Sequence, residues 1–170
     1  TSILSQNDAG QSLPLVIGTV FYAVLDQFDS TRELKVKIHK VNEAGASSLE
    51  VGDIDIYESD RLITTIEAKD KEFQSADVVH AAIKAVQGNL NHFYFIYHNT
   101  RKEICELQSI KRDCINMGCE VTIITIDQFI DFMFGLLNKV NFEKTSKFII
   151  DSMDQMAVTD TFSRRVISLI

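Results

Sequence analysis

The 170-residue sequence predicts a mixed α/β domain, in which helices flank a central mixed sheet and a helical extension follows at the C-terminal end. Apolar residues recur every second residue in some stretches, which is typical of strands, and every three to four residues in others, which is typical of helices. The patterns appear in the order helix, three strands, helix, strand, helix, strand and then helices. This αβββαβ order, with the helical extension over residues 127–170, is the predicted fold class.

The first helix is predicted from a long apolar run. Residues 15–28 are almost wholly apolar, Ser12 is a candidate N-cap and Pro14 is tolerated in a first helical turn. Such a run indicates a helix that is buried on most sides. Residues 1–11 are small and polar, and predict a flexible lead-in.

The first strand is predicted over residues 32–41, where every second residue is apolar. Lys35 and Lys37 lie between the apolar positions and therefore share one cationic face. A solvated face is the simpler interpretation of these lysines. A strip that contacts phosphates is the alternative, if the face borders a cleft.

Residues 51–57 and 62–69 form a candidate hairpin, because β-branched and polar residues alternate in both and the join is entirely polar. The later elements are predicted as a helix over 76–90, an aromatic strand over 92–98, a helix over 101–117, a β-branched strand over 120–126, and helices over 127–140, 144–156 and 160–170. The β-branched strand is typical of a parallel strand covered on both faces. Gly118 stands where a left-handed helix cap is expected.

Particular residues are expected to face the core or to cap these later helices. The inward stripe of the 76–90 helix is predicted to contain Val79, Ala82, Ile83, Val86 and Leu90. That of the 101–117 helix is predicted to contain Ile104, Leu107, Ile110, Cys114 and Ile115. Asp127 and Asp160 are the candidate caps of two C-terminal helices.

Cysteines and histidines give no metal-binding or disulfide pattern. Cys105, Cys114 and Cys119 are odd in number and lack CxxC spacing, so we expect three buried free thiols. The four histidines are scattered, and most are expected to be neutral and structural. The aromatic residues of 92–98 are expected in the core, with a stacking platform for bases as the less favoured alternative.

Composition sets further bounds. A single proline, seven glycines and 45% hydrophobic residues predict one domain over residues 1–170. The chain starts at Thr1, which makes it a candidate fragment of a longer protein. No apolar run approaches the roughly 20 residues of a membrane span and no signal peptide pattern opens the chain, so a cytoplasmic location without a membrane partner is expected. The net charge of −7 counts against a nucleic-acid partner.

Charged residues spaced two apart make the candidate hairpin the centre of the functional hypothesis. In a strand this spacing places Asp53 with Asp55 on one face, and Glu67 with Lys69 on one face. Three carboxylates and one ammonium then converge, and hard oxygen ligands suit Mg²⁺ or Mn²⁺. A plain two-residue turn would put Glu67 on the face opposite Asp55, so the hypothesis requires a longer loop or a bulge.

The same residues resemble a known signature. GDIDIY (52–57), followed about a dozen residues later by IEAK (66–69), is similar to the motif of the PD-(D/E)XK nuclease superfamily, which has the restriction-endonuclease-like fold. The run IEAKDKEFQSADVVHAAIKA (66–85) resembles that of SacI-type restriction enzymes. No proline precedes either aspartate, so the choice between Asp55, which matches the motif aspartate, and Asp53 stays open.

The resemblance implies roles for individual residues. Asp55 and Glu67, with the carbonyl of Ala68, would hold Mg²⁺, or Mn²⁺ as a substitute, and Lys69 would orient or deprotonate the attacking water. Asp53 would hold a second metal or none. The acid that the first helix often supplies is absent, or replaced by Asn7, Asp8 or Gln11. Candidate DNA contacts are Lys35, Lys37, Lys71, Gln74, His80 and Lys84.

The resulting hypothesis is a metal-dependent endonuclease, restriction-type by resemblance, that hydrolyses phosphodiester bonds of double-stranded DNA. Dimerisation is expected by analogy, and residues 166–170 could supply an apolar surface or pack inward. A DNA-recognition segment outside this chain is left open. The alternatives are an inactive nuclease-like binding domain and an unrelated α/β regulatory or scaffold module.

Overall fold

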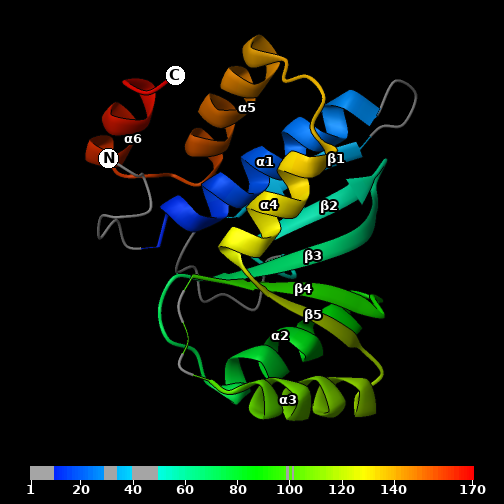
Figure 1. Cartoon of the computed structure of the whole chain (residues 1–170). Coiled ribbons are helices and arrows are strands. Elements are labelled where there is room, and N and C mark those ends of the chain that lie inside the picture. Colours follow the sequence, from blue (N-terminus) through cyan, green and yellow to red (C-terminus); the bar gives the residue numbers. More distant parts are fainter. Residues whose placement is uncertain (1–9, 29–33, 40–49, 99, 101) are drawn as a thin grey trace.

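The computed structural model describes residues 10–28, 34–39, 50–98, 100 and 102–170 (Figure 1). The elements are α1 (Ser12–Phe28), β1 (Leu34–Ile38), β2 (Ile54–Glu58), β3 (Arg61–Lys69), α2 (Ser75–Gln87), β4 (His92–Tyr97), α3 (Ile104–Asn116), β5 (Glu120–Thr125), α4 (Ile126–Leu136), α5 (Phe142–Gln155) and α6 (Asp160–Ile167). Their order confirms the predicted α/β class with its C-terminal helices.

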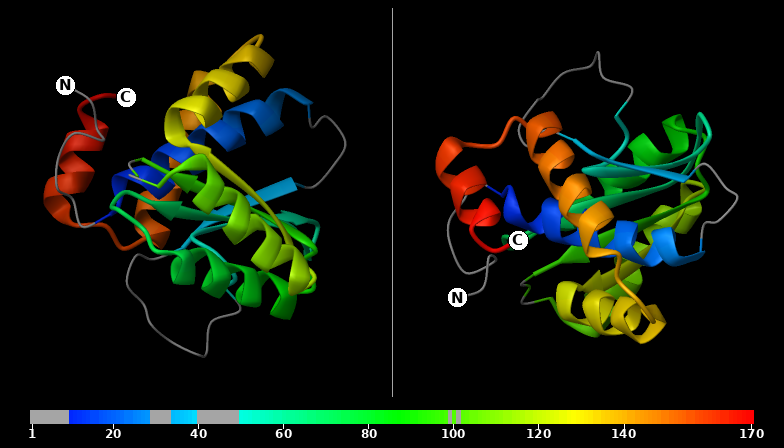
Figure 2. Two further views of the ribbon diagram at one scale, coloured as in Figure 1. Left: turned by 60° about the horizontal axis from the view of Figure 1, so that its bottom comes forward. Right: turned by 90° about the horizontal axis from the view of Figure 1, so that it is seen from above.

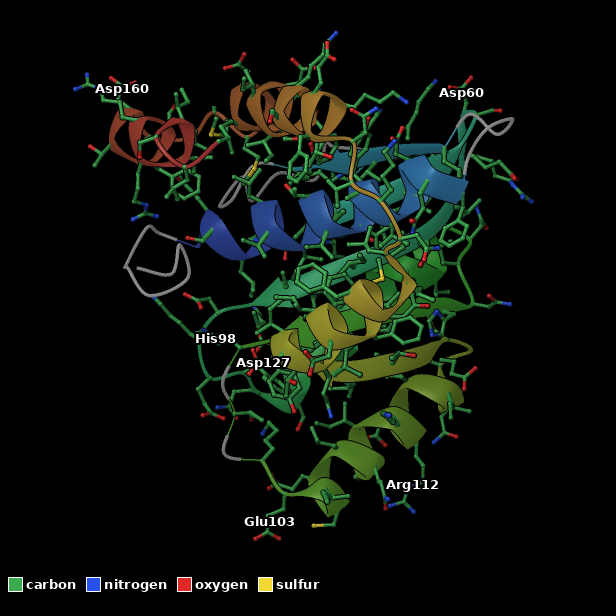
Figure 3. All side chains as sticks on the ribbon, turned by 45° about the horizontal axis from the view of Figure 1, so that its top comes forward. Asp60, His98, Glu103, Arg112, Asp127 and Asp160 are labelled. Carbon is green, nitrogen blue, oxygen red and sulfur yellow. The ribbon has the colours of Figure 1, made fainter. Side chains whose placement is uncertain are left out.

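The five strands form one mixed sheet in the order β1-β2-β3-β4-β5. β1, β2 and β3 pair antiparallel, whereas β3, β4 and β5 pair parallel. The carboxyl ends of β3, β4 and β5 therefore meet at one edge of the sheet. Figure 3 shows His98, which follows β4, beside Asp127, which follows β5, at this edge.

Two apolar layers cover the sheet unequally. α1, α4 and α5 lie over one face, where Ile38, Ile54 and Ile66 are buried beneath them (Figures 1 and 2). Tyr22 of α1 stacks on Phe148 of α5, with ring centroids 4.2 Å apart. On the other face α2 and α3 cover the β4 and β5 half, whose apolar side chains form the second cluster. The β1 to β3 half of that face carries polar side chains.

A β-bulge sets the register of the β2–β3 hairpin. Glu58 pairs with Arg61 across a two-residue turn, but the pairing shifts between Ile56 and Tyr57, and Asp55 then faces Thr65. Residues two apart share a face, so Asp55, Thr65 and Glu67 lie on the same side of the sheet. The bulge that the sequence required is present.

Both helix faces predicted after the hairpin are partly confirmed and partly wrong. Of the predicted α2 stripe, Ala82 and Leu90 are buried, whereas Ile83 and Val86 are exposed. The helix also buries Val78, Ala81 and Ala85. In α3 Ile110 and Cys114 are buried, but Ile104 is 76% exposed and Ile115 56%. In α2 the buried alanines belong to the cluster that contains Phe93, Phe95 and Tyr97 of β4, so packing outweighs the hydrophobicity pattern.

Three smaller predictions also differ from the structure. Thr125 and Thr159, not Asp127 and Asp160, cap α4 and α6 by accepting a hydrogen bond from the backbone of Gln128 and Phe162. Ser12 is the first residue of α1 and not its cap. Cys105 is exposed, whereas the expected burial of Cys114 and Cys119 is confirmed.

Other expectations are confirmed. Gly118 has a φ of +86°, in the left-handed region. Phe93, Phe95 and Tyr97 of β4 are buried in the core under α2 and α3. In the C-terminal run 166–170, Val166 packs inward while Ile167, Leu169 and Ile170 are exposed. Within the described ranges, no helix is long and apolar enough to cross a membrane.

We predict that Gly52→Ala destabilises the protein by about 1–3 kcal/mol, because a Cβ there would overlap the Thr65 hydroxyl and lie 2.7 Å from the carbonyl oxygen of Ile66. Gly135→Ala is the matched control. Its Cβ would meet nothing within 4 Å, and alanine favours the helix by up to about 1 kcal/mol. Urea unfolding of both variants checks the prediction, and equal stabilities would contradict it.

Candidate active site

Asp53 and Glu67 form a carboxylate pair where β2 begins opposite β3. Ile54 pairs with Ile66, so the residues on either side of this pair, Asp53 and Glu67, are neighbours across the strands. The backbone N–H of Ala68 donates to Asp53 Oδ2 at 2.8 Å, which fixes the aspartate against β3. Both carboxylates line a surface pocket of about 550 Å³.

The pocket brings together the start of α1, Asp53 before β2, and the segment from the end of β3 to the first turn of α2. It is lined by Gly10, Leu13, Pro14, Asp53, Glu67, Ala68, Lys69, Asp70, Lys71, Glu72 and Asp77. The start of α1 forms one wall, the end of β3 and the following loop another, and the first turn of α2 the third. Such a concave site with convergent charged groups is the usual form of an active site.

Lys69 ends β3 and points toward the first turn of α2. Its Nζ lies 3.4 Å from Asp77 Oδ1, and both side chains are about one third exposed. The Lys69 carbonyl accepts a hydrogen bond from the backbone N–H of His98 at 2.9 Å, which ties this strand end to β4. Lys69 therefore enters the pocket from a backbone that is anchored to β4.

Burial raises the pKa of both paired carboxyl groups. For Glu67 the pKa rises from 4.5 to about 7, because burial and the neighbouring Asp53 charge outweigh the attraction of Lys84 and Lys69. The pKa of Asp53 is also raised by burial, although the Ala68 N–H, Lys84 and Lys69 oppose this. Two carboxylates so close titrate as a pair, and ionising both is unfavourable without a cation between them.

The donor set fits a hard divalent cation. In the described part of the chain no hydrogen bond or ion pair engages the Glu67 carboxylate, although burial restricts its access to water. Asp53, Glu67 and the carbonyl of Ala68 supply oxygen ligands of the kind that Mg²⁺ prefers. The side chains number only two, however: among the described residues, no three Asp, Glu, His or Cys groups are placed to hold a metal.

The structure places Asp55 away from this pocket. Its side chain is fully buried, and its oxygens accept hydrogen bonds from His39 Nε2 at 3.0 Å, the N–H of Val51 at 3.0 Å, the N–H of Gly52 at 3.1 Å and the hydroxyl of Thr65 at 2.5 Å. Little acceptor capacity remains for a metal. Of the two aspartates that the sequence left open, the geometry favours Asp53 as the partner of Glu67.

The Asp55 network holds the turn that precedes Asp53. Burial would raise the pKa of Asp55, but the hydrogen bonds from His39, Thr65 and Val51 outweigh it and the pKa lies below its ordinary value. His39 Nδ1 lies 3.2 Å from Glu50, so the ring bridges two carboxylates. The backbone N–H groups of residues 51 and 52 donate hydrogen bonds to Asp55. These hydrogen bonds fix the backbone segment that leads into Asp53.

The candidate DNA contacts fall into two groups. Lys71 lines the pocket. Lys84 lies on α2, and its charge lowers the pKa of both carboxyl groups. Gln74 and His80 are exposed on or beside α2. Lys35 and Lys37 are exposed on β1 and line a second hollow of about 470 Å³, together with Tyr57, Leu62 and Gly88. Lys37 Nζ lies 4.8 Å above the Tyr57 ring.

Among the described residues, α1 supplies no acid to the pocket. Gly10, Leu13 and Pro14 form that wall. Gln11, one suggested replacement, instead accepts a hydrogen bond from the backbone of Thr159 at 3.4 Å. Asn7 and Asp8 lie outside the described residues.

Sequence reasoning missed Asp77 and His39. Asp77 is not among the predicted site residues, yet it lies in the first turn of α2, where its Oδ2 accepts a hydrogen bond from the N–H of Gln74 at 2.7 Å. A Q-x-x-D pattern at a helix start was the available signal. For His39 the signal was weaker, because only the sheet register places it beside Asp55.

We predict that Asp55→Asn lowers the free energy of unfolding by about 2–3 kcal/mol, because the amide would place N–H groups against backbone N–H donors. Asp60→Asn, an exposed turn residue, should change it by less than about 0.5 kcal/mol. Denaturant unfolding at pH 7 measures both. A neutral Asp55→Asn would contradict the structural role.

The raised pKa of Glu67 predicts a pH dependence of stability. The protonated form is favoured in the folded state, so its stabilisation is complete below about pH 4.5 and is lost as the pH rises to about 7. Wild-type protein in chelator should therefore lose stability relative to Glu67→Gln across this window. Unfolding curves at pH 4.5, 6, 7 and 8 measure the difference, and a constant difference would refute the assignment.

The first 98 residues of the chain match a known protein family. The family model described as the SacI restriction endonuclease C-terminal domain matches residues 1–98, which is more than half of the chain and spans α1 to β4. A search among curated proteins found no match. The matched region contains Asp53, Glu67, Lys69 and Asp77. The chain thus belongs to the SacI restriction endonuclease C-terminal domain family.

Proposed function

We propose that this chain is the nuclease domain of a restriction-type endonuclease that hydrolyses phosphodiester bonds of double-stranded DNA with Mg²⁺. One observation carries the proposal: Asp53, Glu67, Ala68 and Lys69 line a single pocket in a chain of the SacI family. The arrangement of two acids, an intervening carbonyl and a lysine is that of the PD-(D/E)XK signature, with Asp53 as the motif aspartate.

Each of these pocket residues would have a separate role in the reaction. Asp53, Glu67 and the Ala68 carbonyl would hold the divalent cation, which supplies stabilisation of the negative charge that develops on the phosphate. Lys69 would orient the attacking water and accept its proton. The Ala68 N–H keeps the Asp53 carboxylate in place at 2.8 Å, so one of the two acids is positioned before substrate arrives.

Cationic side chains on the same sheet face support a path for DNA. Lys35 and Lys37 lie on the face that carries Asp55, because Lys37 pairs with Asp55 across β1 and β2. Lys84 and Lys71 lie nearer the carboxylates. These positions offset part of the −7 net charge where the phosphate backbone would lie. Dimerisation, by analogy with restriction enzymes, remains a proposal.

A second candidate is a nuclease-like domain that binds DNA without cutting it. The grouping of only two acidic side chains, in the part of the chain that the structure describes, favours this alternative. The two candidates differ in cleavage and not in DNA binding. The unrelated scaffold module that the sequence left open is disfavoured by the family match.

We predict cleavage of long double-stranded DNA of mixed sequence by the complete protein in Mg²⁺ or Mn²⁺, and none in EDTA. Asp53→Asn, Glu67→Gln and Lys69→Ala should each lower the cleavage rate by roughly a hundredfold or more, because each removes a group that acts on the reacting phosphate or water. Gel analysis of fragments against time measures the rates.

Asp151→Asn, which removes an exposed charge from α5, is the matched control and should cut at the wild-type rate. Mn²⁺ should also raise the melting temperature of wild-type protein and not that of Glu67→Gln. Mn²⁺ stabilisation without cleavage would identify the inactive relative. Undiminished cleavage by Glu67→Gln would place the active site elsewhere.

A further inference from the structure

The Lys69 ammonium is held by a carboxylate that the motif does not include. Asp77 Oδ1 lies 3.4 Å from Lys69 Nζ, and both side chains line the pocket that contains Asp53 and Glu67. Asp77 stands eight residues after Lys69, on a different element, so the contact depends on how α2 docks against the end of β3.

Asp77 is itself held rigidly. Its second oxygen, Oδ2, accepts the backbone N–H of Gln74 at 2.7 Å, and its own N–H donates to the Gln74 carbonyl at 3.0 Å. The two carboxylate oxygens therefore have separate partners: one closes the first turn of α2 and the other faces Lys69. The turn is in turn fixed by Val78, which is fully buried in the core.

A flexible lysine needs such a partner to act at one place. Its four-carbon side chain has many rotamers, and fixing the ammonium costs conformational entropy that an ion pair offsets. Asp53 and Glu67 also attract Lys69, but a bound cation would compete with the ammonium for these two acids. Asp77 forms an ion pair with Lys69 in the structure, at 3.4 Å.

We propose that Asp77 is a positioning residue for the nuclease reaction, which holds the Lys69 ammonium in the orientation needed to act on the attacking water. This inference rests on the proposed function and assigns a further residue to the same site. Asp77 acts through Lys69 and touches neither the water nor the phosphate.

The test compares Asp77→Asn, Asp77→Glu and Lys69→Ala in the complete protein, with the same long double-stranded DNA and Mg²⁺. The asparagine side-chain oxygen can still accept the Gln74 N–H, so the melting temperature should stay within roughly 3 °C of wild type. The cleavage rate at saturating protein should fall roughly tenfold or more, with unchanged DNA affinity in EDTA. Asp77→Glu, which restores the charge, should recover most of the rate.

A double variant separates positioning from a general loss of charge. In the Lys69→Ala background, Asp77→Asn should cause no further loss, because its effect passes through Lys69. Asp160→Asn, in the first turn of α6 (Figure 3), is the matched control for removing a helix N-terminal charge and should leave the rate unchanged.

The outcomes distinguish a failure of the positioning role of Asp77 from a failure of the proposed nuclease function. If wild type cuts and Lys69→Ala does not, an Asp77→Asn rate equal to or above that of wild type overturns the positioning role, and an increase would mean that Asp77 sequesters the lysine. An additive loss in the double variant also overturns it. If wild type does not cut, or Lys69→Ala cuts as well as wild type, the proposed function itself fails.

Discussion

The register of the β2–β3 hairpin is the constraint on which the candidate site depends. At the bulge, β3 contains one residue more than the facing stretch of β2. This extra residue keeps Glu67 on the side of the sheet that carries Asp53 and Asp55. Without it, the apolar residues of β3 would face the polar side and Glu67 would be buried under α1. The packing of Ile54 and Ile66 under α1 therefore selects the same register as the site chemistry.

Asp53 and Asp55 stand two residues apart, yet they have opposite roles because their surroundings differ. Asp55 has hydrogen bond donors on both oxygens and its pKa is lowered, so it is a stable buried anion. Asp53 faces another carboxylate and its pKa is raised. The first arrangement stabilises the fold, whereas the second places two buried carboxyl groups next to each other, which is unfavourable when both are ionised. A site of the second kind is what perturbed pKa values indicate at functional positions.

The sequence was sufficient for the fold class and for the existence of the β2–β3 hairpin, since both follow from patterns along the chain. It could not decide between Asp53 and Asp55, because only the donors that surround each carboxylate distinguish them, and these come from β1, β3 and the preceding turn. The inward face of α2 was predicted only in part for a related reason. Alanines occupy the cluster that contains Phe93 and Phe95, and hydrophobic periodicity gives small alanines little weight. Asp77, on the same helix, was not predicted as a site residue.

α2 joins two roles that are usually separate in a domain. Its alanines pack against the aromatic core, while Asp77 and Lys84 on the same helix act on the pocket. A larger side chain at Ala82 would displace the whole helix, and the two charges would move with it by similar amounts. Substitutions at the small buried residues of α2 are therefore expected to change the geometry of the pocket without touching it.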